Sequence, residues 1–303
     1  LIILLIPNLD PKFYLAALII GLVLQSTVFL HLDIFISHYS NFNNTGTIRG
    51  FFLTAQNIAY FIGAVLAGFL LQSNNFWNIF LFGLALNIPV MILTYKYLKD
   101  FKDPVYQKTE FLKTGIRILK DKDLYNAISI NGVLRVFYSW MIIYTPIYLT
   151  SVIGFTISET ALIIGLALIP FLIITNPLGY VADKVLGEKE IMVCGFIVIS
   201  VSTMLMMVTE VKDFWIWVAI LFSTRIGASM IEVMGEAYLF KKISESDLNM
   251  VSFFRILNPL TNLIFPTIAS GLLLFINIKY LFLILGIFML YGIKYSLAIK
   301  DTR

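Results

Sequence analysis

Charged side chains occur inside long apolar stretches of this chain, where their presence needs a chemical reason. Arg225, Glu232 and Glu236 lie in one stretch at offsets of seven and eleven residues. At about 100° per residue these offsets place them on one face of a helix. Guanidinium groups bind carboxylate oxygens in bidentate fashion, and a buried carboxylate can carry a proton. This face is therefore a candidate for binding a charged solute or a proton.

A second stretch carries Asn131, Arg135 and Tyr138 at spacings of four and three residues, which also form one helical stripe. Its helix contains no acidic residue that could neutralise Arg135 at mid-depth. Two arginines in one cavity would suit an anionic or carboxylate-bearing solute. The alternative is a structural charge network, in which each arginine pairs with an acid on another helix, such as Asp33 or Glu232.

The elements that hold these residues are predicted to be membrane-spanning helices. Of the 303 residues, 59% are hydrophobic and only 13% are charged, which excludes an ordinary soluble domain. The apolar runs have the length that a helix needs to cross about 30 Å of hydrocarbon. We predict an all-α polytopic fold with about nine complete spans: roughly 13–37, 48–71, 76–98, 125–149, 157–178, 190–209, 214–239, 250–275 and 278–298.

The loop charges indicate the orientation. Most loop lysines and arginines fall in alternate connections, whereas Lys12, Lys212 and Lys279 fall on the opposite side. The positive-inside rule places the richer side in the cytoplasm. Residues 99–124 and the C-terminus are therefore predicted to be cytoplasmic. The expected location is the plasma membrane, which in a bacterium is the cell inner membrane.

The segment 99–124 is the one long polar connection. Within it Phe111, Leu112, Ile116 and Leu119 form one apolar stripe. That pattern predicts an amphipathic helix lying at the membrane surface.

A polar loop at 176–189 links two apolar runs and contains Gly179, Asp183, Lys184 and Gly187. This loop resembles the cytoplasmic signature of the major facilitator superfamily of transporters. The resemblance implies two six-helix bundles. It makes 1–98 an N-terminally truncated first bundle that starts at the end of a third span, near 1–6. It makes 99–124 the linker and 125–303 an intact second bundle.

The resemblance also implies roles for several charged residues in gating. Asp183 would accept from N–H groups at the start of the helix near Arg49, locking the outward-facing state. Asp33 and Glu236 occupy matching positions in the two halves, near the cytoplasmic ends of their spans, and are expected to form a gate or structural network. Lys184 and the two loop glycines belong to the same motif.

Neutral polar residues complete the candidate solute site. Gln25, Asn57 and Asn258 are expected at similar depth, where helix–helix hydrogen bonds are the alternative role. Asn258-Pro259 and Pro266 are expected to bend their helix.

The predicted function is secondary active transport of a small solute by rocking of two bundles, with proton coupling through Glu232 as an option. We expect no enzymatic activity, cofactor, metal or nucleic-acid partner, and a monomer in the lipid bilayer. Cys194 is the only cysteine, so no disulfide framework or cysteine-based metal site is expected. A non-transporting receptor on the same scaffold and an intramembrane transferase are the alternatives.

Overall fold

The computed structural model describes residues 10–39, 45–71, 76–99, 110–174, 177–178, 187–242 and 248–300. These residues are almost entirely helical, and no strand occurs among them. The chain divides into two compact units, Leu1–Tyr106 and Gln107–Arg303, here called unit 1 and unit 2.

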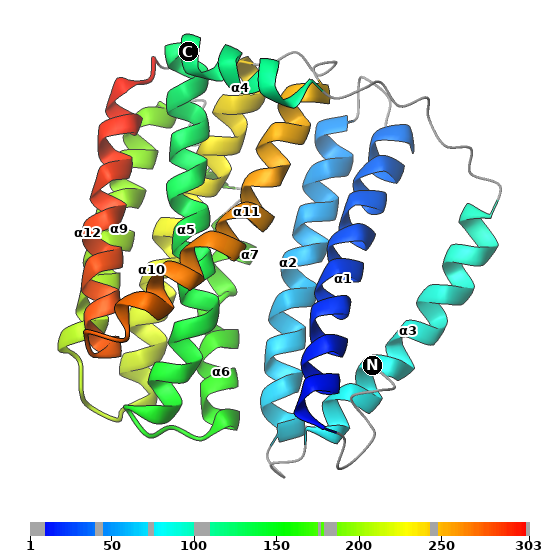
Figure 1. The fold of residues 1–303 in the computed structure, drawn as a ribbon, viewed down its shortest axis with the longest axis vertical. Helices are drawn as coiled ribbons and strands as arrows, with labels where there is room; N and C mark the ends of the chain where they lie inside the picture. The colour runs from blue at the N-terminus through cyan, green and yellow to red at the C-terminus, as the bar shows by residue number, and fades with distance from the viewer. Residues whose placement is uncertain are drawn as a thin grey trace. The chain divides into compact units, whose positions relative to one another are not determined.

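The described residues of unit 1 form three long helices (Figure 1). They are α1 (Pro11–Tyr39), α2 (Thr45–Leu70) and α3 (Trp77–Leu98). Helix α2 contacts both α1 and α3. The helix end expected near 1–6 lies outside the described residues.

Unit 2 is a bundle of long helices crossed at one end by the short helix α4 (Phe111–Lys120) (Figure 1). The bundle helices are α5 (Lys122–Ser151), α6 (Ile157–Ala167), α7 (Ile169–Ile173), α9 (Glu188–Val208), α10 (Phe214–Lys242), α11 (Leu248–Leu272) and α12 (Ile278–Ala298). Helix α9 packs along α10 and α12, while α5 contacts α10, α11 and α12.

A helix occupies each predicted range, although the range 157–178 is divided. Helix α6 ends at Ala167, and α7 begins at Ile169 with Pro170 in its first turn. Proline has no N–H to continue the helical pattern. The Leu168 N–H instead donates to the Gly165 carbonyl at 3.0 Å. This single predicted span is therefore two consecutive helical pieces.

Among the described residues, five helices are long and apolar enough to cross a membrane: Trp77–Leu98, Lys122–Ser151, Glu188–Val208, Phe214–Leu239 and Ile278–Ala298. Apolar segments at Pro11–Gln25, Thr54–Leu70 and Ile157–Ile173 are shorter. The count of nine complete spans remains a prediction. Many large apolar side chains of unit 2 face outward, among them Ile142, Val201 and Leu297. An outward apolar surface suits a helical bundle surrounded by lipid.

Large aromatic side chains from four helices lie in the interior of unit 2. Phe137, Tyr148, Phe196, Trp217 and Phe282 are fully buried there. The Tyr148 ring centroid lies 5.8 Å from that of Trp217 and 5.0 Å from that of Phe282. These edge and tilted ring contacts connect α5 to α10 and α12 and fix their spacing.

Helices α9 and α10 approach so closely that only glycine fits at the crossing. A Cβ on Gly227 would lie 2.6 Å from the Gly195 carbonyl oxygen and 2.7 Å from the Ile199 nitrogen. A Cβ on Gly195 would lie 2.9 Å from the Gly227 carbonyl oxygen. Helix pairs in membranes depend on such small residues for close packing.

The proline-containing helix α11 is tied to α5 by side-chain donors. Trp140 Nε1 donates to the Phe265 carbonyl at 2.9 Å, and the Tyr144 hydroxyl donates to the Pro266 carbonyl at 2.8 Å. Helix α11 continues through Pro259 and Pro266 and changes direction along its length in Figure 1. The expected bend is attributable to these prolines, because proline disrupts helical hydrogen bonding without ending every helix.

Candidate functional site

The charged residues predicted on two helices meet between α5 and α10. Arg135 of α5 reaches two carboxylates of α10, with Nη1 3.6 Å from Glu232 Oε1 and Nη2 3.4 Å from Glu236 Oε1. The two glutamates are four residues apart, so they stand on one face one helical turn from each other. A single guanidinium therefore bridges both acids.

Tyr138 joins this network one turn along α5 from Arg135. Its hydroxyl donates to Glu232 Oε2 at 3.1 Å, so both carboxylate oxygens of Glu232 have a partner on α5. The Tyr138 ring also lies 6.0 Å from the Arg135 guanidinium carbon. Arg135, Tyr138, Glu232 and Glu236 are named here the α5–α10 charge network. Its ionic side chains are between 19% and 28% exposed, so the network is partly buried.

Arg225 has a different environment from Arg135, although both were predicted for one site. Only 6% of Arg225 is exposed, and its guanidinium carbon lies 5.6 Å from the Phe137 ring centroid. Its Nε and Nη1 atoms are buried and have no hydrogen-bond partner among the described residues. A cation over an aromatic face is stabilised by the ring quadrupole, but that contact does not satisfy N–H donors. Arg225 therefore retains donors for an anionic group.

Asn131 lies in the interior of α5 and is committed to packing. It is 1% exposed, and its Nδ2 donates to the Ala127 carbonyl of the preceding turn at 2.9 Å. A Cβ on Gly235 would lie 3.3 Å from Asn131 Nδ2, so α10 passes close to this amide. This contact favours a helix–helix role for Asn131.

The other predicted site residues are distributed over separate elements. Gln25 is exposed on α1, Asn57 is half-buried on α2, and Asn258 is exposed on α11. Asp33 and Arg49 belong to α1 and α2, but their side chains lie outside the description.

Most of the predicted loop motif lies outside the described residues, including Gly179, Asp183 and Lys184. Gly187 is described, and it is the residue that precedes α9, with extended φ and ψ of −75° and 167°. The next residue, Glu188, is 4% exposed at its side chain and accepts from Lys241 Nζ at 2.7 Å. The end of the motif is thus joined to the end of α10 by an ion pair.

A second ion pair lies close in sequence to the first, at the same end of α10. Lys242 Nζ donates to Asp123 Oδ2 of α5 at 2.9 Å. Consecutive lysines of α10 therefore contact the first turns of both α9 and α5.

No group of three or more metal-ligating side chains occurs in the part of the chain that the structure describes.

These observations define a helical membrane protein with a partly buried charge network and a buried arginine in one helical bundle. Residues 128–299 match the sequence profile described as Major Facilitator Superfamily. The match covers more than half of the chain, and the chain belongs to this superfamily. A search of the curated proteins found no match.

Membership establishes the general character of the protein. The superfamily consists of membrane transporters rather than enzymes, and its members bind small solutes while embedded in a lipid bilayer. The resemblance inferred from the loop at 176–189 is therefore confirmed at the level of the family. The alternative of an intramembrane transferase has no support from this membership.

Sequence reasoning missed three contributors to this region. The sequence does not predict that Phe137 contacts Arg225, since an aromatic residue in an apolar helix is expected only to pack in the core. Glu188 could have been suspected, because a carboxylate in the first turn of a helix is stabilised by the helix dipole. The Gly195–Gly227 contact depends on the facing of two helices, which one sequence does not specify.

Proposed function

We propose that this transporter carries a small solute with an anionic group, such as a carboxylate, and that Arg225 binds that group. The supporting observation is the buried Arg225 guanidinium with two nitrogens that have no partner among the described residues. Burying a charged donor without an acceptor is costly, so such a group is retained where a ligand supplies the acceptor. The solute carboxylate would take that place.

The α5–α10 charge network has the opposite character and serves coupling in this proposal. Arg135 is already neutralised by Glu232 and Glu236, so it offers little attraction to a further anion. Arg135, Arg225 and the two glutamates sum to zero charge. An arriving anion makes the sum negative unless a proton binds at the same time. Glu232 is the proposed proton acceptor, because protonation would remove its ionic attraction to Arg135 and thereby loosen the contact between α5 and α10.

The remaining predicted residues keep proposed roles in the transport cycle. Movement follows rocking of two bundles, assigned to 1–98 and 125–303 and joined by the linker 99–124. The loop residues Gly179, Asp183, Lys184 and Gly187, with Arg49 and Asp33, act in gating. The C-terminus and linker are assigned to the cytoplasmic side of a bacterial inner membrane, and the protein acts as a monomer.

The test is uptake by proteoliposomes that contain the full chain. The probes are labelled acids, each paired with its neutral amide: succinate with succinamide, glutamate with glutamine, and benzoate with benzamide. Uptake of at least one acid over its amide is expected. Arg225→Met should reduce that uptake at least tenfold, and Arg225→Lys should restore only part, because ammonium lacks the planar fork of guanidinium.

Lys279→Met is the matched control for loss of one cation. Lys279 donates to Glu210 at 2.9 Å, outside the α5–α10 charge network, so uptake should match the wild type. Unchanged uptake by Arg225→Met would exclude Arg225 from the site. Equal uptake of acids and amides, or no uptake of any pair, would reject the anionic solute.

Proton coupling has its own readout. An inward proton gradient should accelerate uptake by the wild type. Glu232→Gln should remove this acceleration while leaving exchange of labelled for unlabelled solute, which needs no net proton movement. A gradient response that survives in Glu232→Gln would refute coupling through this residue.

A further inference from the structure

The short helix α4 presents three distinct faces, of which one holds it on unit 2. Thr114 and Ile118 are buried, and the Phe111 ring stacks on Phe253 of α11 with centroids 4.9 Å apart. The Glu110 N–H donates to Asn249 Oδ1 at 3.2 Å, which fixes the start of α4 to α11. These contacts determine which side chains of α4 point outward.

The second face of α4 is apolar and exposed. Leu112, Ile116 and Leu119 follow at spacings of four and three residues, which places them on one stripe. Leu112 is 81% exposed and Leu119 is 73% exposed. Leucines so exposed beside one another form an apolar surface patch, which indicates that this stripe meets an apolar medium.

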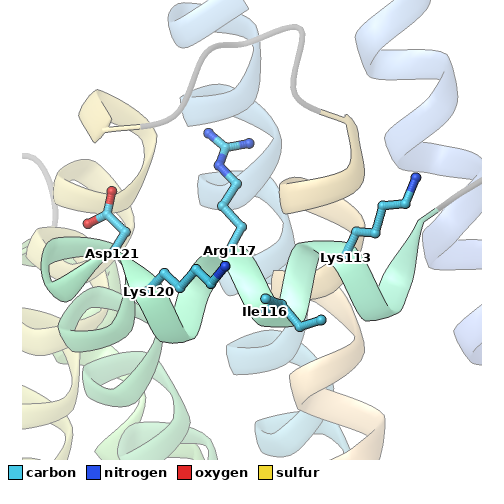
Figure 2. A pocket seen from close by; sticks show the side chains of 5 residues that line it. All are labelled: Lys113, Ile116, Arg117, Lys120 and Asp121. Carbon is cyan, nitrogen blue, oxygen red and sulfur yellow. The ribbon is translucent and has the colours of Figure 1, made fainter.

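The third face is basic and borders the apolar stripe. Lys113, Arg117 and Lys120 repeat the same four-and-three spacing, and together with Ile116 and Asp121 they line an open, shallow depression (Figure 2). The side chains of Lys113 and Arg117 extend to the same side of α4 in Figure 2. The depression thus combines cationic donors with an apolar edge.

Two acidic residues of this segment, Glu110 and Asp121, take little of the charge from Lys113 and Lys120. Lys113 lies 2.6 Å from Glu110, but the two side chains are 76% and 51% exposed, and such surface pairs are weak. The Asp121 carboxylate is directed to the start of α5, where it accepts from the N–H groups of Asp123 and Leu124. The face therefore keeps a net positive character.

We infer that α4 binds an anionic phospholipid, whose phosphate contacts the basic face while an acyl chain covers the apolar stripe. Two independent features of α4 match one phospholipid molecule. The basic face can bind its anionic headgroup, and the adjoining leucines can pack against its acyl chain. Basic amphipathic helices at membrane surfaces attract anionic lipids through both terms. This lipid site is separate from the proposed solute site on Arg225 and does not depend on it.

The experiment places the full chain in nanodiscs and reads lipid contact directly at α4. A bimane fluorophore is attached to Leu112→Cys in a Cys194→Ser background. Quenching is then compared between brominated phosphatidylglycerol and brominated phosphatidylcholine. Each cation near a membrane surface favours an anionic lipid about fivefold. Lys113 is shared with Glu110, and Arg117 also has another partner, so we expect a preference for phosphatidylglycerol of roughly fivefold or more.

Two triple variants separate the basic face from general charge. Combined Lys113→Gln, Arg117→Gln and Lys120→Gln should reduce the preference to about one. The control removes three cations from outside α4, at Lys12, Lys212 and Lys279, and should leave the preference unchanged.

Four results would overturn the inference. Equal quenching by both lipids, with the three cations of α4 intact, would show that α4 does not select an anionic headgroup. A preference that survives the α4 triple variant would place the headgroup elsewhere. Absence of quenching by either lipid would mean that protein, not lipid, covers the apolar stripe. A preference abolished by soluble glycerol phosphate would assign the site to a free phosphate ester instead.

Discussion

Replacing Gly227 with alanine tests the close approach of α9 and α10 that organises unit 2. The new Cβ would lie 2.6 Å from the Gly195 carbonyl oxygen and 2.7 Å from the Ile199 nitrogen. Both atoms belong to the backbone of α9, so no side-chain rotation can relieve the clash. The helices must separate by several tenths of an ångström to reach ordinary contact distance.

The cost of this separation can be set against the helix preference of alanine. Overpacking of a well-filled interior costs about 1–3 kcal/mol. Alanine in a helix interior recovers up to about 1 kcal/mol relative to glycine. Separation also disturbs α12, because its backbone at Gly286 lies so close to α9 that an added Cβ would be 3.0 Å from the Ser200 carbonyl oxygen. The net expectation is a loss of about 1–2 kcal/mol of stability.

The assay is thermal unfolding of the full chain in detergent, followed by intrinsic fluorescence. Gly227→Ala should unfold several degrees below the wild type. Gly132→Ala is the matched control, since a Cβ at Gly132 on α5 has nothing within 4 Å and should leave stability equal or higher. If both variants are as stable as the wild type, the reasoning from the α9–α10 distance fails.

Two further predictions concern the ion pairs and the orientation. Lys241→Met should lower the free energy of unfolding by about 1–3 kcal/mol, because it removes the Lys241 cation from a carboxylate that is 4% exposed. Glu188→Gln should lower it by less than about 1 kcal/mol. Equal shifts of the unfolding temperature in the two variants would contradict this reasoning. In a Cys194→Ser background, Lys122→Cys should react with an impermeant thiol reagent only from the cytoplasmic side, and Lys212→Cys only from the opposite side. The reverse pattern would invert the predicted orientation.

Most of the helical ranges could be predicted because membrane thickness imposes about 20 apolar residues on each span. The ends of the helices were harder to predict from the sequence, since they depend on local capping hydrogen bonds. Helix α5 begins at Lys122, three residues before the expected start, because the Asp121 carboxylate caps its first N–H groups. The interruption at Leu168 was missed because Pro170 could equally bend a continuous helix, as Pro266 does in α11.

The sequence predicted which helix faces carry the candidate site residues, but not which side chains contact one another. Helical periodicity placed Glu232 and Glu236 on one side of α10, and both carboxylates contact Arg135. Periodicity describes one helix at a time, so it could not decide which arginine would receive these acids. That choice depends on the rotation of α5 against α10, which the packing of Phe137 and the Gly235 contact help to set.

The two arginines show why helix facing matters for the substrate class. If both had been paired with acids, neither would offer free donors to an anion, and a neutral solute would fit equally well. If neither were paired, two uncompensated cations would lie within a low-dielectric region, at a cost of several kcal/mol each. The arrangement with Arg135 paired and Arg225 over Phe137 leaves one guanidinium with donors to spare. One such group suits one carboxylate, and in the proposed mechanism Glu232 would accept the proton that keeps the whole site neutral.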